Sequence, residues 1–482
     1  MATVIFPTRP TTLATRMPSS ALTLTALVAL APLAFAHGGH EEIPAGEAIS
    51  AKPIDNTLWI HILLQSFAWG IVFPTGMVLG LVRSRWHVPT QVLGTALAVV
   101  GYFLGHLHKG RQFGPNAHAG FANWLMIMLI AQVVGGAYLR LHLERGILGK
   151  VRPWQVRGHK ILGILMPVAA WVQMLFGGIA SQGFCQGEHI GQCLAHFIMG
   201  SAFIAYGIVL TILLLNGQAW LARTGRSQEF WDSCIIAAWG CVNTFTEHHW
   251  GDPWRQNDLQ HTSMGIIWWA AGLVGIWLSR DRQGRPKRNV IPGIVIFLTG
   301  WGMSGHAQHL ELSTHVHAVF GYTLMAAGLT RIIEISFILR DKPTLVGPEG
   351  GDVDAEINSW QYLPVFLLFA SGFVFMAATE EQMALMATAE VTHVSYILIL
   401  YSLAFLLFLF VLMLVHLYSA YRPPYTPKPR GAGNSVDETP RANGHARVPN
   451  ATDRQAADAE EFELEGLMSD DEEGKPLNGH AH

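Results

Sequence analysis

Runs of apolar residues recur from residue 58 to residue 417, and they restrict the possible folds of this chain more than any other feature. About eleven runs reach the roughly 20 predominantly apolar residues that cross a bilayer as a helix, which satisfies its own backbone hydrogen-bonding groups in lipid. The 482 residues are 50% hydrophobic and only 13% charged, as expected when lipid is the main solvent. The runs lie near residues 58–82, 88–107, 118–139, 160–180, 194–215, 231–247, 260–279, 290–307, 316–339, 361–379 and 392–417. We therefore predict an all-α fold, a polytopic transmembrane helical bundle of about eleven spans.

The N-terminus has the pattern of a secretory signal peptide. Arg9 and Arg16 precede an apolar run that ends at Ala34-Phe35-Ala36, a small-x-small processing site. We expect residues 1–36 to be removed; the alternative, a first transmembrane anchor, is disfavoured because the apolar core is short. The mature chain would be an integral membrane protein of the secretory pathway, in the plasma membrane or an endomembrane, with its N-terminus outside.

The loop charges agree with this orientation. An odd number of spans leaves the C-terminus in the cytosol, and the loops then inside are rich in Lys and Arg, as the positive-inside rule requires. The outer loops hold little positive charge beyond Lys52, Lys109, Arg111 and Arg255. Residues 422–482 are rich in Pro, Gly, Asn, Asp and Glu, which predicts a disordered cytosolic tail. A net charge of −3 and the lack of a basic domain give no reason to expect nucleic acid as a partner, so the expected partner is the lipid bilayer.

The four cysteines form two pairs with different expectations. Cys185 and Cys193 fall in the outer loop between the fourth and fifth spans, where the oxidising compartment favours a disulfide. Cys234 and Cys241 lie seven residues apart in the sixth span, where we expect them to pack as small hydrophobic residues.

A histidine stands at the start of each of the first four predicted spans. Ionisable residues in membrane spans mark functional sites by default. His61 and His118 lie near the outer surface, whereas His87 and His159 lie near the inner surface. A haem iron with two axial imidazoles needs facing histidines at one level of a helical bundle, and this arrangement supplies two such levels. The alternative is that interfacial histidines only anchor helix ends. His87 stands just before Pro89, in a loop or a first turn, so further ligand candidates remain. They are His106, His108 and His196.

Several motifs accompany these histidines. They are His61 with Ala68-Trp69-Gly70, Pro74-x-Gly76 and Arg83; His87 with Gln91; His118-x-Gly120 with Gln132; and His159-x-x-x-Gly163 with Gln173. In their order and spacing, residues 57–180 resemble the cytochrome b561 family. The resemblance implies two b-type haems, bound by His61 with His118 and by His87 with His159. It also implies electron transfer across the bilayer from an ascorbate-type cytosolic donor to an outer acceptor such as ferric iron or monodehydroascorbate. We take residues 37–215 as this haem-binding domain, and the whole chain resembles the fungal Ytp-type polytopic membrane proteins.

Residues 231–421 form a second, histidine-rich transmembrane domain, whose ligand-type residues gather at the outer ends of its spans. Imidazole and carboxylate groups bind zinc, copper or iron, and residues three apart share a helical face. The alternative is a wet outer vestibule lined by interfacial histidines. The candidate metal ligands are His248, His249, His261, His306, His309, His315, His317, Glu380 and His393.

Three functions compete at this stage. The leading hypothesis is a b561-type transmembrane oxidoreductase, or metalloreductase, that passes electrons from the inner haem to the outer haem and then to a ferric or cupric ion or a small molecule. The second is a metal or proton-coupled transporter with an outer histidine site. The third is a non-catalytic scaffold whose acidic tail binds a partner.

Overall fold

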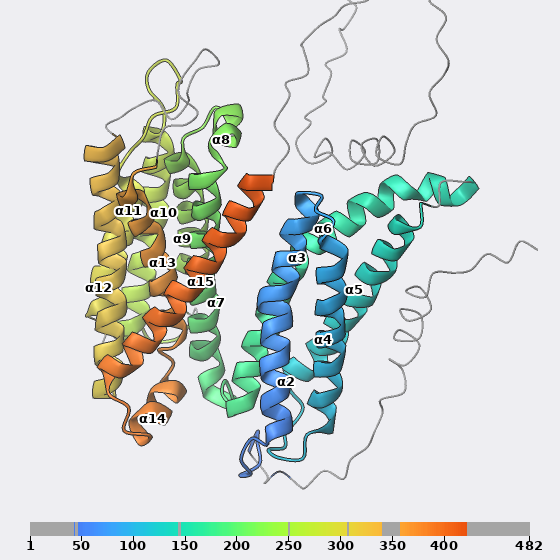
Figure 1. The fold of residues 1–482 in the computed structure, drawn as a ribbon. Helices are drawn as coiled ribbons and strands as arrows, with labels where there is room; N and C mark the ends of the chain where they lie inside the picture. The colour runs from blue at the N-terminus through green and yellow to red at the C-terminus, as the bar shows by residue number, and fades with distance from the viewer. Residues whose placement is uncertain are drawn as a thin grey trace, which may run out of the picture. The chain divides into compact units, whose positions relative to one another are not determined.

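The computed structural model describes residues 43, 47–142, 146–248, 251–305, 308–339 and 357–421. The expected signal peptide and the cytosolic tail lie outside these residues. The described chain is helical, and its only β pairings are isolated bridges such as Ile49 with Phe113 (Figure 1). The all-α polytopic bundle predicted from the sequence is confirmed. Contacts divide the chain into two units: unit 1 holds the residues up to Met77 and Val88–Gly177, and unit 2 holds Val78–His87 and the residues from Gly178 on.

Unit 1 is built from two helical hairpins that run side by side (Figure 1). The first hairpin joins α2–α3 to α4, and the second joins α5 to α6. The contact boundary assigns the last residues of α3, His87 at the start of α4 and the last residues of α6 to unit 2. The helices are α2 (Asn56–Phe67), a π-helical turn (Ala68–Val72), α3 (Phe73–Leu81), α4 (His87–Leu107), α5 (Ala117–Arg140) and α6 (Gly146–Gln182).

Local sequence explains how the first helix of unit 1 begins and changes. The carboxylate of Asp55 caps α2 by accepting a hydrogen bond from the Leu58 amide at 3.0 Å. Pro74 lacks an amide hydrogen, so the helix cannot keep a continuous ladder of i to i−4 bonds at this point. The π-helical turn at Ala68–Val72 lies just before this proline. Such turns often mark functional sites.

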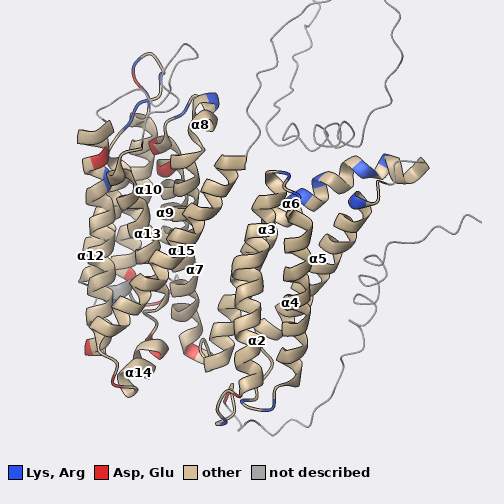
Figure 2. Cartoon of the chain, in the orientation of Figure 1, with Lys and Arg blue, Asp and Glu red and all other residues tan. Residues whose placement is uncertain are grey.

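The middle of unit 1 is apolar and its charged residues lie at its ends. Trp69, Phe73, Leu125, Leu129 and Met166 belong to one buried cluster that joins the two hairpins. Figure 2 shows Lys and Arg gathered around the first part of α6 and the neighbouring end of α5. The opposite end carries Lys52, Asp55, Lys109 and Arg111.

Unit 2 contains seven long helices, within which glycines allow close packing. A Cβ on Gly200 of α7 would lie 2.7 Å from the Gly372 carbonyl oxygen on α13, and one on Gly300 of α11 would lie 2.5 Å from the Gly321 oxygen on α12. Small residues of this kind let transmembrane helices approach closely. The long helices are α7 (Ile190–Leu215), α9 (Gln228–Thr246), α10 (Gln256–Leu278), α11 (Ile291–Ser304), α12 (Glu311–Ile333), α13 (Tyr362–Met376) and α15 (His393–Tyr421). The shorter ones are α8 (Gln218–Thr224) and α14 (Glu380–Thr388).

The number of spans differs from the sequence-based expectation. Of the described helices, nine are long and apolar enough to span a membrane, not eleven. The 14 residues of α11 are too few, and α9 is made more polar by residues such as Glu229 and Asp232. The contact boundary between the units falls at Gly177–Gly178, and α7 beyond it packs against α13 in unit 2.

Candidate functional site

His61 and His118 meet at one end of unit 1. His61 lies on α2 in the first hairpin and His118 on α5 in the second, and their ring centroids are 6.2 Å apart with an interplanar angle of 89°. Two metal–imidazole bonds of about 2 Å each, extended from nitrogen to ring centre, give a centroid separation of roughly 6 Å. The spacing therefore suits two axial ligands of one metal ion.

Hydrogen bonds position both rings. His61 Nδ1 lies 2.7 Å from the Gly101 carbonyl oxygen, and His118 Nδ1 lies 3.1 Å from the Gln173 carbonyl oxygen. A carbonyl only accepts, so His61 Nδ1 carries the hydrogen and donates it, which leaves Nε2 with its lone pair, in the tautomer that metal-ligating histidines usually have. His118 Nδ1 also lies 3.0 Å from the side-chain nitrogen of Gln173, a donor, so its two contacts are compatible with either tautomer.

Glycines on the neighbouring helices make room for both rings. A Cβ on Gly105 of α4 would lie 2.7 Å from His61 Nδ1, and a Cβ on Gly177 of α6 would lie 3.1 Å from the same atom of His118. Gln173 adds a second restraint, because its side-chain amide donates to the His118 carbonyl oxygen at 3.0 Å. The position of each ring is therefore set by its own hairpin.

His159 and His87 have similar surroundings. The His159 ring lies 3.2 Å from the position of a Cβ on Gly136, and the His87 ring lies 2.8 Å from that of a Cβ on Gly80. Gly177 on α6 lies against the His118 ring, and His159 lies earlier on the same helix. At a rise of 1.5 Å per residue, these two positions on α6 are about 27 Å apart along the helix axis. This distance is close to the roughly 30 Å hydrocarbon thickness of a bilayer. Each of the four expected haem ligands thus has a glycine against its ring, and His87 is the first residue of α4.

The other N-terminal candidates lie near His61 but make different contacts. His106 is exposed and contacts Tyr102 with tilted rings at a centroid distance of 4.5 Å, and His108 packs on Phe113 at 5.6 Å. Burial lowers the pKa of His108. Among His106, His108 and His118, the ring contact observed with His61 is that of His118.

Two loop segments, one around Ser50 and the other at Lys109–Gln112, are joined by hydrogen bonds at the same end of unit 1. The Ser50 amide donates to the Gln112 carbonyl oxygen at 3.0 Å, and the Lys109 amide donates to the Asp55 carboxylate at 3.0 Å. The hydrogen bond from Lys109 is the main reason that the pKa of Asp55 lies below its usual value. The Lys109–Gln112 segment is thereby attached to the start of α2, the helix that carries His61.

The metal ligands expected in unit 2 are divided among pairs. His248 stacks on Trp254 with centroids 3.7 Å apart, and its Nδ1 lies 3.3 Å from Asp258. His261 lies 3.2 Å from Glu247, His315 stacks on His393 at 4.5 Å, and Glu380 lies 3.4 Å from His189. His309 is exposed in the turn before α12, whereas His249 and His306 lie outside the described residues. Within the described ranges, no three of the expected ligands bring their ligand atoms within 4.8 Å of one another.

His317 has a different partner from the one its place in the sequence suggested. Its ring centroid lies 5.8 Å from that of His196 on α7, with an interplanar angle of 82°. His196 entered the sequence analysis as a further haem-ligand candidate and His317 as part of an outer metal site. The fold of unit 2 brings these two residues together.

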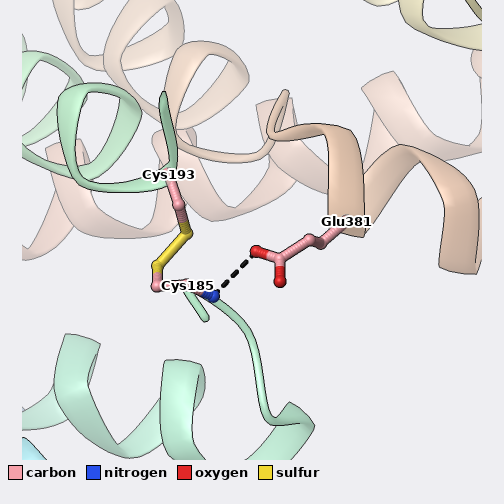
Figure 3. Close-up of side chains that lie close together, drawn as sticks. All are labelled: Cys185, Cys193 and Glu381. Carbon is pink, nitrogen blue, oxygen red and sulfur yellow. Dashed lines mark hydrogen bonds between the residues drawn. A yellow bond between two sulfur atoms is a disulfide. The ribbon is translucent and has the colours of Figure 1, made fainter. Parts of the chain in front are cut away.

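The disulfide expected between Cys185 and Cys193 is present and joins the loop before α7 to the first turn of this helix. Figure 3 shows Glu381 beside it, and its carboxylate accepts a hydrogen bond from the Cys185 amide at 2.7 Å. These three residues have ligand-type atoms close together, but the thiolate is the metal ligand and the sulfurs here are bonded to each other. The group therefore ties the loop to α14. Cys234 and Cys241 are free thiols.

A buried ionic network in unit 2 was not expected from the sequence. Glu229, which is fully buried, accepts hydrogen bonds from Arg288 at 3.2 Å and Arg331 at 2.8 Å. Arg331 also pairs with Glu334 at 2.7 Å, and Tyr206 donates to the buried Asp232. The available signal was the spacing of charged residues three apart at span ends, as in Glu229 with Asp232 and Arg331 with Glu334.

These features define the class of the protein as a polytopic helical membrane protein. Residues 169–419 match the family model described as "Protein YTP1-like, C-terminal", and residues 41–142 match a domain of unknown function, DUF2427. The first match covers more than half of the chain, which therefore belongs to the Ytp1-like family. Neither match names the cytochrome b561 family, so that resemblance remains a prediction.

Two relatives illustrate the membership. Protein YTP1 of Saccharomyces cerevisiae is 46% identical over 261 residues, which cover 54% of this chain and 54% of the relative. An uncharacterized membrane protein of Schizosaccharomyces pombe is 22% identical over 454 residues, with 69% of this chain and 88% of the relative covered. The chain thus spans about half the length of the first relative and most of the second. No solved structure matches the chain.

Proposed function

We propose that this chain transfers electrons across the membrane through two b-type haems, from a cytosolic donor to an acceptor outside. The observation that carries the proposal is the His61–His118 pair, whose nearly perpendicular rings have centroids 6.2 Å apart. A bound haem iron would alternate between the ferrous and ferric states and hold one electron at each level.

The residues at the outer level fit such a group. The Gly101 carbonyl oxygen holds the His61 imidazole with Nε2 available, Gln173 positions the His118 ring, and Gly105 and Gly177 make room for the two rings where a Cβ would crowd them. Below this level, the buried cluster around Trp69 and Phe73 keeps the interior apolar and dry. His87 and His159, with the same glycine backing, are the proposed ligands of the inner haem.

The donor and acceptor come from the cytochrome b561 resemblance. An ascorbate-type donor would act on the cytosolic side, and a ferric or cupric ion or a small molecule would accept the electron outside, as in a transmembrane metalloreductase. Both levels lie at helix ends, which supports exchange of electrons with molecules in water on either side.

Difference spectroscopy of the purified, full-length chain tests this proposal. We expect reduced-minus-oxidised bands of low-spin b haem. His61→Ala and His118→Ala should remove the same half of the signal, and His159→Ala should remove the other half. The exposed His309 supplies a matched control, since His309→Ala should leave the spectrum unchanged. A folded but colourless protein would refute the proposal, and different losses in His61→Ala and His118→Ala would refute the pairing.

The proposed orientation places the mature N-terminus outside and residues 422–482 in the cytosol, in a plasma or endomembrane of the secretory pathway. The gathering of Lys and Arg at one end of unit 1 supports it (Figure 2). A tag inserted after Arg422 should be digested by protease added to the cytosolic face only. Digestion from the opposite face would reverse the topology.

The buried ionic network favours a second candidate, an ion-coupled transporter. Ionisable residues inside membrane domains commonly line ion or proton pathways, and Glu229, Asp232 and Glu334 are all buried in unit 2. Metal or proton flux into vesicles that contain the purified chain, abolished by Glu229→Gln and kept by His61→Ala, would favour transport over electron transfer.

A further inference from the structure

A second histidine pair lies in unit 2, away from the proposed haem ligands. His196 on α7 and His317 on α12 are 9% and 3% exposed, and their ring centroids are 5.8 Å apart at an interplanar angle of 82°. These values are close to the 6.2 Å and 89° of His61 and His118. Separate elements bring both pairs together, so neither results from helical spacing alone.

The two rings also have the tautomer of His61. His196 Nδ1 lies 2.8 Å from the Gln192 carbonyl oxygen, and His317 Nδ1 lies 2.9 Å from the Ser313 carbonyl oxygen. Each Nδ1 therefore donates its hydrogen to the turn before it, and the Nε2 lone pair is the ligand atom of each ring. The separation again matches two metal–nitrogen bonds of about 2 Å each.

We propose that His196 and His317 together bind one transition-metal ion, with copper(I) as the ion that the surroundings favour. The pair lies among apolar groups: Phe375 stacks on His196 with a centroid distance of 4.6 Å, and Phe320 packs on Phe375 at 4.5 Å. Met376 of α13 packs against Gly200, one turn from His196, and its sulfur accepts a hydrogen bond from Ser201 at 3.5 Å. Two neutral imidazoles in apolar surroundings suit copper(I), a monovalent ion that binds imidazole and commonly takes only two ligands.

The close packing indicates a bare ion and not a haem. A Cβ on Gly200 would lie 2.3 Å from Met376 and 2.7 Å from the Gly372 carbonyl oxygen, so α7 and α13 are in contact one turn from His196. Phe375 covers one face of the His196 ring. A porphyrin would have to extend sideways from the axis between the two rings into this packed region.

The experiment uses the full-length chain in detergent under anaerobic conditions. Copper(I) is supplied as a soluble chelator complex, excess is removed by desalting, and copper per chain is measured by mass spectrometry. X-ray absorption at the copper edge then identifies the ligands. We expect one copper ion per chain, imidazole scattering from two rings, and at least a tenfold loss of bound copper in His196→Ala and in His317→Ala.

The stacked pair of the exposed His315 and the half-buried His393 supplies the control. The double variant His315→Ala with His393→Ala removes as many imidazoles from unit 2 and should keep its copper. If the His196 and His317 variants do not fold, the absorption spectrum of the unchanged chain still decides, because it needs no substitution.

Three outcomes would overturn the proposal. They are a chain without bound copper, a copper spectrum without imidazole, and an iron porphyrin that disappears in His196→Ala. The result is independent of the proposed haems, because the spectrum assigned to His61 and His118 is expected to persist in the His196 and His317 variants.

Discussion

Substitution of Gly105 by alanine provides a graded test of the proposed outer haem site. The new Cβ would lie 2.7 Å from His61 Nδ1, which is about 0.7 Å short of ordinary contact at 3.4 Å. Because Nδ1 is held at 2.7 Å by the Gly101 carbonyl oxygen, the ring cannot move away without stretching this hydrogen bond. Overpacking of this kind costs about 1–3 kcal/mol, and each 1.4 kcal/mol is tenfold in affinity. We expect Gly105→Ala to weaken binding of the outer haem about 5- to 150-fold.

The assay is haem retention of the purified chain during titration with a competing apo-haem protein, followed by difference spectroscopy. Gly177→Ala should have a smaller effect, since its Cβ would lie 3.1 Å from the His118 ring. Gly120→Ala and Gly158→Ala are matched controls, because nothing lies within 4 Å of the added Cβ. The inner haem should be retained in all four variants. Equal retention in Gly105→Ala and Gly120→Ala would refute the argument that Gly105 makes room for a ligating ring.

Three further predictions concern stability and pH. Glu229→Gln leaves Arg288 and Arg331 with less countercharge and should lower the free energy of unfolding by about 3–5 kcal/mol in denaturant titrations. Asp281→Asn removes one partner of a more exposed pair and should cost under about 1 kcal/mol. Equal effects of the two substitutions would refute the importance of burial. Cys185→Ser removes a disulfide of sequence separation 8 and should lower the free energy of unfolding by about 2–3 kcal/mol, measured by thermal unfolding. Added reductant should not lower the stability of this variant further, and a further loss would contradict the disulfide assignment. The pKa of Asp55 is lowered by the Lys109 amide, so its stabilising effect is complete above the unfolded value near 3.8 and is lost as the pH falls through the lower folded value. Asp55→Ala should cost about 1 kcal/mol at pH 7 and flatten this acid-dependent loss, and an unchanged acid profile would count against the cap.

Much of the fold was accessible from sequence because lipid imposes a strong pattern. Apolar runs of sufficient length predicted every long helix, and the place of His61 and His118 at the start of two parallel spans predicted that they share a level. The lengths of α9 and α11 were less certain, because a buried charge or a short run can belong to a helix that other helices surround.

The arrangement of unit 2 was harder to predict, since it depends on which helices are neighbours. The histidines at its span ends share a depth, but depth does not determine which of them meet, and His317 pairs with a residue more than 100 positions earlier in the chain. The charges of Glu229 and Arg331 likewise neutralise each other across different helices. Such pairings follow from glycine-mediated contacts, such as Gly200 with Gly372, that no local pattern specifies.

The division of ligands between the two hairpins of unit 1 bears on how the protein matures. His61 belongs to the first hairpin and His118 to the second, so neither hairpin holds a complete outer site by itself. A cofactor bound by both residues would hold the two hairpins together. Because only the form with both hairpins in contact would bind it, the cofactor would stabilise that form by mass action. In newly inserted chains of a haem-starved cell, the buried apolar cluster would still hold the two hairpins together, but the ends that carry His61 and His118 would separate more easily. Cofactor supply would thus set how many chains pass membrane quality control, quite apart from any effect on electron flow.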